Sequence, residues 1–101
     1  MGTVHVTFEL WCEWSGEPPS YRVYINNDLM TERTYTFDNS QEYLEERVPL
    51  LTKSGAHFLK IDNLNSDNAT FTIKNFKVNN KIRDYRERDC RFVLNQDDLK
   101  V

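Results

Sequence analysis

The chain has 101 residues, a formal net charge of −3 and 29% charged side chains. This length leaves room for one hydrophobic core, so we expect a single domain over residues 1–101. The small net charge and the lack of an apolar run of roughly 20 residues predict neither a nucleic-acid partner nor a membrane span.

Residues 4–14 alternate strictly between apolar and polar side chains, with the two-residue period of a half-buried strand. The apolar positions share one parity and are Val4, Val6, Phe8, Leu10, Cys12 and Trp14. Trp11 has the opposite parity, so we expect its indole to point outward. Gly16, Pro18 and Pro19 end the strand, because proline has no amide proton to donate to a ladder.

Residues 21–37 predict a β-hairpin. Tyr21, Val23 and Ile25 share one face of the first arm, and Asn26, Asn27 and Asp28 suit a left-handed turn. The return arm covers residues 29–37, where β-branched and aromatic side chains favour extension. Residues 38–40 close this arm.

Residues 41–51 contain helix formers, yet Pro49 limits any helix there to about two turns, and we favour a strand. Residues 52–55 form a turn, and His57, Leu59 and Ile61 then alternate in a further strand. A polar loop follows over residues 63–68.

The apolar parity changes within residues 69–78, which predicts a β-bulge near Lys74 and Asn75. Asn79 and Asn80 suit a two-residue hairpin turn, and a last strand lies over residues 91–94. About seven or eight short strands with frequent turns indicate an all-β protein, a single antiparallel β-sandwich of jelly-roll-like form.

The loop after the strand of Ile61 concentrates oxygen ligands of the kind that calcium prefers. Asp62, Asn65 and Asp67 are weak metal candidates, but the spacing is not that of an EF-hand, since Asp67 stands where the turn needs glycine. We therefore expect an ordinary surface loop and no cofactor, with a calcium site as the alternative.

Neither the cysteines nor the histidines suggest catalysis. Cys12 and Cys90 are expected to be reduced thiols, unless the first and last strands are neighbours and bring them face to face. His5 and His57 have no serine or cysteine arrangement around them that indicates a nucleophile, so we expect structural histidines and no enzyme.

Aromatic side chains are the better candidates for a binding surface. An outward Trp11, together with Tyr24, Tyr35 and Tyr43, could stack on a sugar ring or anchor a protein interface. The alternatives are that both sheet faces are covered, or that Trp11 lies beneath the loop of Pro18 and Pro19.

Five stretches carry a resemblance to known domains: residues 21–28, 33–37, 43–46, 55–61 and 71–78. In this order they resemble the small jelly-roll domains found among carbohydrate-binding modules and tailed-phage structural proteins. The resemblance spans residues 21–78 and rests on strand types, such as a Val-Tyr-Ile-Asn strand before a turn and a glycine that opens a strand of alternating His, Leu and Ile. It implies the fold more than the function.

We accordingly expect a non-catalytic structural or accessory protein that acts through surface contacts, as a phage virion-associated component. Its partners would be other proteins of an assembly or further copies of itself. The alternative is a carbohydrate-binding module with an aromatic platform, assisted by calcium. The residues after Met1 show no signal-like stretch, so we expect synthesis in the cytoplasm.

Overall fold

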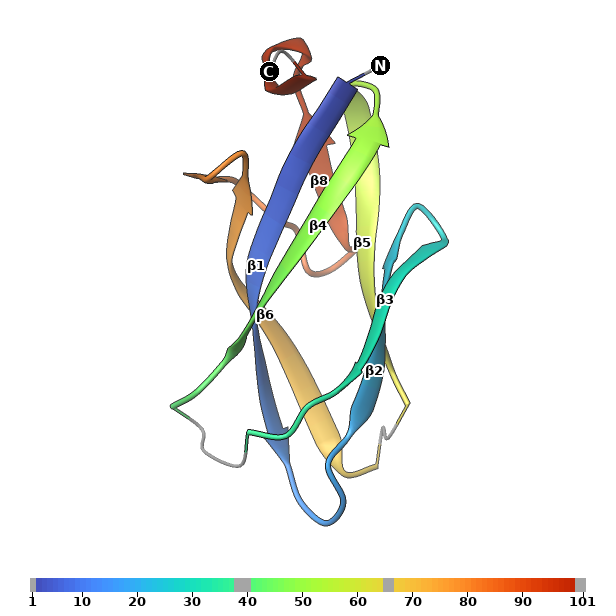
Figure 1. Ribbon diagram of the computed structural model, residues 1–101, viewed down its shortest axis with the longest axis vertical. Helices are drawn as coiled ribbons and strands as arrows, with labels where there is room; N and C mark the ends of the chain where they lie inside the picture. Colours follow the sequence, from blue (N-terminus) through green and yellow to red (C-terminus); the bar gives the residue numbers. More distant parts are fainter. Residues whose placement is uncertain (1, 38–40, 65–66, 100–101) are drawn as a thin grey trace.

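Two four-stranded antiparallel sheets pack face to face in the computed structural model, which describes residues 2–37, 41–64 and 67–99 (Figure 1). The molecule is elongated, with extents of 44 × 25 × 21 Å, and the strands run along its long axis. The predicted fold class, an all-β sandwich of about eight strands, is confirmed.

The first sheet has the order β4-β1-β6-β7, with β4 at Leu44–Thr52, β1 at Gly2–Trp14, β6 at Ala69–Val78 and β7 at Lys81–Ile82. The second has the order β3-β2-β5-β8, with β3 at Asp28–Thr34, β2 at Ser20–Ile25, β5 at Gly55–Asn63 and β8 at Arg91–Leu94. A short 3₁₀ helix, η1, follows at Gln96–Leu99. Because β4 returns to lie beside β1 while β2 and β3 belong to the other sheet, the first four strands form a Greek key folded across the sandwich.

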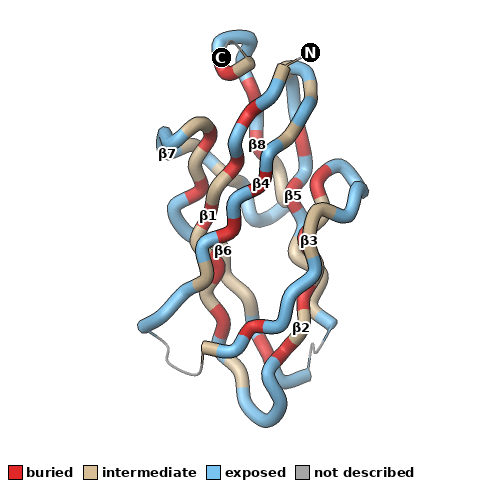
Figure 2. The backbone as a smooth tube through the Cα atoms, viewed as in Figure 1, coloured by how far each residue is buried: buried red, intermediate tan, exposed pale blue. Residues whose placement is uncertain are grey.

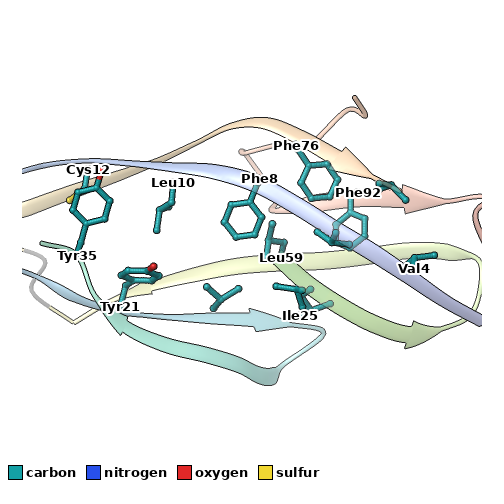
Figure 3. Close-up of a cluster of buried hydrophobic side chains, with 14 of the residues drawn as sticks. Val4, Phe8, Leu10, Cys12, Tyr21, Ile25, Tyr35, Leu59, Phe76 and Phe92 are labelled. Carbon is teal, nitrogen blue, oxygen red and sulfur yellow. The ribbon is translucent and has the colours of Figure 1, made fainter. Parts of the chain in front are cut away.

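The core lies between the sheets and follows the predicted alternation. Val4, Val6, Phe8 and Leu10 of β1 are at most 1% exposed, and buried and non-buried residues alternate along the strand (Figure 2). In Figure 3, Phe8 and Leu10 face Tyr21, Ile25 and Leu59 of the opposite sheet. The apolar rhythm of the sequence therefore fixes which face of each strand is buried.

Asparagines make the two predicted tight turns. Asn26 and Asn27 have φ of 52° and 70°, and Asn79 and Asn80 have φ of 51° and 69°. Two successive left-handed residues match the right-handed twist of a hairpin, as in a type I′ turn, and asparagine tolerates this conformation better than most residues. Both predicted hairpins, β2–β3 and β6–β7, are confirmed.

The predicted bulge in β6 is also present. The register of β6 against β1 shifts between Thr7 and Glu9, and Asn75 adopts a φ of 52°. One extra residue on β6 lets Phe71 and Ile73 share the inner face with Phe76 although their parities differ.

The ambiguous stretch forms a strand, β4, as predicted. It pairs with β1 on one side and lies at the edge of its sheet, where Pro49 is tolerated because the missing N–H leaves no central ladder bond unmade. The return arm of the first hairpin is shorter than predicted, since β3 ends at Thr34. The turn predicted for residues 38–40 lies outside the described residues.

The cysteines are free thiols, with Cys12 buried and Cys90 half-buried. Burial raises the pKa of the Cys12 thiol to about 11, so it stays protonated at neutral pH. Strands β1 and β8 belong to opposite sheets, so they are not the paired neighbours that the disulfide alternative requires.

Candidate functional site

Trp11 lies on the outer face of the first sheet, near the C-terminal end of β1, which runs between β4 and β6. It pairs with Thr72 of β6, and its neighbour Leu10 pairs with Leu44 of β4. Leu10 and Cys12 point into the core, so Trp11 points away from it, as predicted. The indole is half-buried on this outer face.

Three side chains hold the indole in place. Tyr43 packs against it with ring centroids 5.0 Å apart and planes tilted by 32°, and the Lys74 ammonium lies 4.6 Å from the ring centroid. The indole Nε1–H donates to Glu9 Oε1 at 3.1 Å. Aromatic pairs and cation–π contacts each contribute on the order of 1 kcal/mol, so the ring has a defined orientation.

We call Trp11 with Tyr43, Glu9 and Lys74 the Trp11 cluster. Tyr43 approaches from the β4 side of β1, whereas Lys74 comes from β6 on the other side. The indole is thus contacted on one side by the residue just before β4 and on the other by a residue of β6, while Tyr43 remains 41% exposed.

A shallow hollow of about 220 Å³ adjoins the indole. Its lining residues are Trp11, Cys12, Glu13, Thr70, Thr72 and Lys74. The hollow offers hydroxyl groups, a carboxylate and an ammonium beside an aromatic ring. It can therefore bind both hydrogen-bond donors and hydrogen-bond acceptors. Its volume is below the roughly 300–1,000 Å³ that is usual for small-molecule sites.

The four predicted aromatic residues do not form one platform. Tyr24 lies on the outer face of the second sheet, where it pairs with Lys60 and Leu29. Only Trp11 and Tyr43 come together among the four.

The assignment of Tyr35 to an exposed binding surface is wrong. Its side chain is 1% exposed, and its hydroxyl donates to the Glu42 carbonyl at 3.0 Å. The ring packs edge-on against Phe37 and Phe71. Arg33 pairs with the buried Tyr21, so the alternation of this arm places Tyr35, two residues further on, on the same inward side, where it closes one end of the core.

The structure describes two of the three predicted metal candidates. Asp62 is half-buried at the end of β5, opposite Arg22, and Asp67 is exposed, while Asn65 lies outside the described residues. Within the described ranges, no three His, Cys, Asp or Glu side chains gather at one point. The Asn63 amide donates to the Ala69 carbonyl at 2.8 Å and closes the described base of this loop.

His57 has a structural environment. It is 5% exposed, with Nδ1 at 2.7 Å from the Asn26 amide nitrogen and Nε2 at 2.8 Å from the Lys53 carbonyl. A carbonyl only accepts, so Nε2 carries the proton and Nδ1 accepts from Asn26. Both ring nitrogens are therefore engaged in joining the β2–β3 turn to the β4–β5 turn.

Two features escaped the sequence analysis. The first is Glu46, which is 1% exposed; it shares the parity of the apolar residues of β4, so the alternation of this strand places it on the inner face, unlike Glu45. The second is a cavity of about 600 Å³ that gathers Arg83, Arg86 and Arg91. These arginines alternate with acids in the sequence, which suggests a neutral polar connection, and only the fold brings them to one cavity.

Comparisons with protein families, with curated proteins and with solved structures find no match to this chain. Within the described residues, none of the helical structure has the length and apolar character needed to cross a bilayer.

Proposed function

We propose that this chain is a non-catalytic β-sandwich that acts through surface contacts with other proteins, as a structural or accessory component of an assembly such as a phage particle. The observation that carries the proposal is the pair of the half-buried Trp11 and the exposed Tyr43 on the outer face of the first sheet. Tryptophan and tyrosine are enriched at the energetic centres of protein interfaces, where a polar rim excludes water around them.

The surroundings of the pair favour a protein partner. The indole is already contacted by Tyr43 and Lys74, so it leaves less free aromatic face for the apolar side of a sugar ring than a stacking platform needs. The same sheet face continues along β4 to Pro49 and to Leu51, which is 68% exposed. An extended face with scattered apolar side chains suits a broad protein contact more than a small ligand.

A carbohydrate-binding module is the second candidate. The exposed ring of Tyr43 could stack on a sugar, and the hydroxyls of Thr70 and Thr72 could hydrogen-bond its substituents. Both candidate functions use Trp11 and Tyr43, so the same variants of these residues distinguish a protein-binding from a carbohydrate-binding role.

Light scattering over a concentration series tests the proposal. We expect the wild-type protein to self-associate as concentration rises, and Trp11→Ala and Tyr43→Ala to weaken association at least tenfold. Tyr24→Ala is the matched control, because it truncates an outward aromatic residue on the other sheet. A glycan array with and without calcium is run in parallel. A protein that stays monomeric and binds a glycan through Trp11 would overturn the proposal in favour of the carbohydrate-binding module.

A further inference from the structure

The cavity of about 600 Å³ lies where the chain separates from the β8 edge. Its lining residues are Arg83, Asp84, Tyr85, Arg86, Arg91, Phe92, Val93 and Asn95. Arg86 and Arg91 form an antiparallel bridge through two backbone hydrogen bonds of 2.8 and 3.0 Å. Before Arg86 the chain leaves the edge, because Tyr85 turns inward to pack on Phe76 and donates its hydroxyl to the Leu59 carbonyl at 2.7 Å.

This separation leaves a short piece of the β8 edge open. The Leu59 N–H donates to the Cys90 carbonyl, whereas the Cys90 N–H donates to the Glu87 carbonyl, so the Cys90 carbonyl and, two residues on, the backbone groups of Phe92 are directed toward β5. Arg91 directs its own groups outward to Arg86, and by the same alternation Val93 directs its N–H and C=O outward. In the described part of the chain, no bridge extends along this edge past Arg86 and Arg91.

The lining of the cavity has more arginines than acids although the chain is acidic. Three arginines and one aspartate line it, against a net charge of −3 for the whole chain. Arg83 is engaged by a bidentate pair with Asp98, and Arg86 contacts Asp89 at 3.3 Å on the surface. Arg91 differs from both, because its Nε is buried without a hydrogen-bond partner in the structure. The half-buried Arg91 lines the cavity and, among the described residues, has no acidic partner, so an incoming carboxylate would supply one.

We propose that the β8 edge binds an extended acidic peptide as an added antiparallel strand, with a glutamate opposite Val93. Arg91 and Val93 share the outer face of β8, so a peptide side chain opposite Val93 is a diagonal neighbour of Arg91. The added strand continues the line of the Arg86 bridge, so the same side chain also lies beside Arg86. Its carboxylate reaches both guanidinium groups. The residues on either side of the glutamate face the other way, toward the half-buried Tyr85 in the cavity wall.

The open backbone favours a peptide over a free anion. Val93 presents one donor and one acceptor beside the arginines, and strand addition uses both. Val93 and Phe58, 47% and 49% exposed, supply apolar surface on the same sheet face. A free phosphate would use the guanidinium groups alone.

Amide NMR titration tests the proposal, with the acetylated and amidated pentapeptide Thr-Val-Glu-Val-Thr as the probe. We expect saturable shifts at the Val93 amide and at the Arg91 Nε–H. Three changes should each weaken binding at least tenfold: glutamine in place of the peptide glutamate, N-methylation of that glutamate, and Arg91→Gln in the protein. Arg88→Gln is the matched control, because Arg88 is exposed in the same segment but does not line the cavity.

Several outcomes would overturn the proposal. An absence of saturable shifts at millimolar peptide excludes the site. Equal affinity of the glutamine and glutamate peptides excludes the charge recognition, and an unaffected N-methylated peptide excludes strand addition. Displacement of the peptide by an equal concentration of inorganic phosphate would leave only a general anion site. Trp11→Ala should bind the peptide normally, which separates this site from the Trp11 cluster.

Discussion

Arg33 and Glu46 join the edge strands of the two opposing sheets, with Arg33 Nε 2.8 Å from Glu46 Oε1. The Glu46 side chain is 2% exposed, whereas that of Arg33 is 53% exposed. The carboxylate is therefore buried, and its cationic partner lies at the surface. Burial raises the pKa of the Glu46 carboxyl, and the Arg33 guanidinium opposes this shift. Burial and the neighbouring Glu46 also raise the pKa of Tyr21, so the phenol stays protonated. An acid in the core is tolerated here because Arg33 covers it.

Arg33→Met should make folding stability strongly dependent on pH. Without Arg33, the charged Glu46 is buried alone, which we expect to lower the free energy of unfolding by about 1–3 kcal/mol at neutral pH. A raised pKa in the folded state means that stability is present below the unfolded pKa and is lost as pH rises through the folded pKa. Urea denaturation across this window should therefore show a smaller loss at low pH. Arg47→Met, on the exposed side of the same strand as Glu46, is the control.

Glu46→Gln tests the ion pair of Arg33 and Glu46 by removing the charge of the acid. A neutral amide of the same shape has no charge to desolvate, so the variant should lose the pH dependence that Arg33→Met shows. In the double variant, Arg33→Met should cost less than it does alone, measured as the coupling in a double-mutant cycle. Additive effects would mean that the two side chains do not interact in solution.

Asp98 should be the main source of acid sensitivity at the other end of the molecule. It is 7% exposed, pairs with Arg83, and accepts the Asn95 backbone N–H at 2.7 Å. These contacts, with the Arg83 hydrogen bond first, lower its pKa. A lowered folded pKa gives stability that is present above the unfolded pKa and is lost as pH falls through the folded pKa.

Asp98→Asn should therefore lower the free energy of unfolding by about 1–3 kcal/mol at neutral pH, because Arg83 loses a charged partner. The difference from wild type should shrink as pH falls through the folded pKa of Asp98, where the wild-type carboxyl becomes protonated as well. Asp84→Asn, at an exposed position outside η1, should change stability by less than about 0.5 kcal/mol. An Asp98→Asn effect that is constant with pH would contradict the ion-pair account.

Gly2→Ala should displace η1 from β1. A Cβ at this position would lie 2.5 Å from the Leu99 carbonyl oxygen, and backbone at that distance has to move. Loosening the contact should raise the exchange rates of the η1 amides by more than tenfold while the centre of β1 stays protected, as hydrogen exchange can measure. Thr3→Ala, at the next and exposed position, should leave these rates unchanged.

The fold was predictable because its determinants are local. Alternating apolar residues assign the core face of β1 and β2, and asparagine pairs place the two tight turns. The outward Trp11 follows from the same alternation. The order of the strands in each sheet does not follow from it, because long-range packing decides which strands become neighbours. That is why the Tyr43 contact of Trp11 and the arginine cavity appear only in the structure.

Tyr35 and Glu46 show how far alternation predicts burial. Tyr35 shares the parity of Arg33, and its N–H donates to the Pro19 carbonyl at 2.8 Å, so Tyr35 continues the β2–β3 ladder and points inward. Glu46 pairs with the buried Phe8 and lies on the inner face of β4. Alternation therefore places both side chains, whereas the ion pair of Glu46 with Arg33 depends on a strand of the other sheet and appears only in the structure.

The bulge at Asn75 gives a last test of how sequence sets the β6 register. Asn75 has a φ of 52°, in the left-handed region that β-branched residues avoid. Asn75→Gly should therefore change the free energy of unfolding by less than about 0.5 kcal/mol, whereas Asn75→Val should lower it by about 1–2 kcal/mol. Thr70→Val, at an exposed position of the same strand with ordinary extended backbone, should be nearly neutral. If valine proves equally harmless at positions 70 and 75, the bulge does not depend on a left-handed residue, and packing of Phe76 in the core would have to hold the register instead.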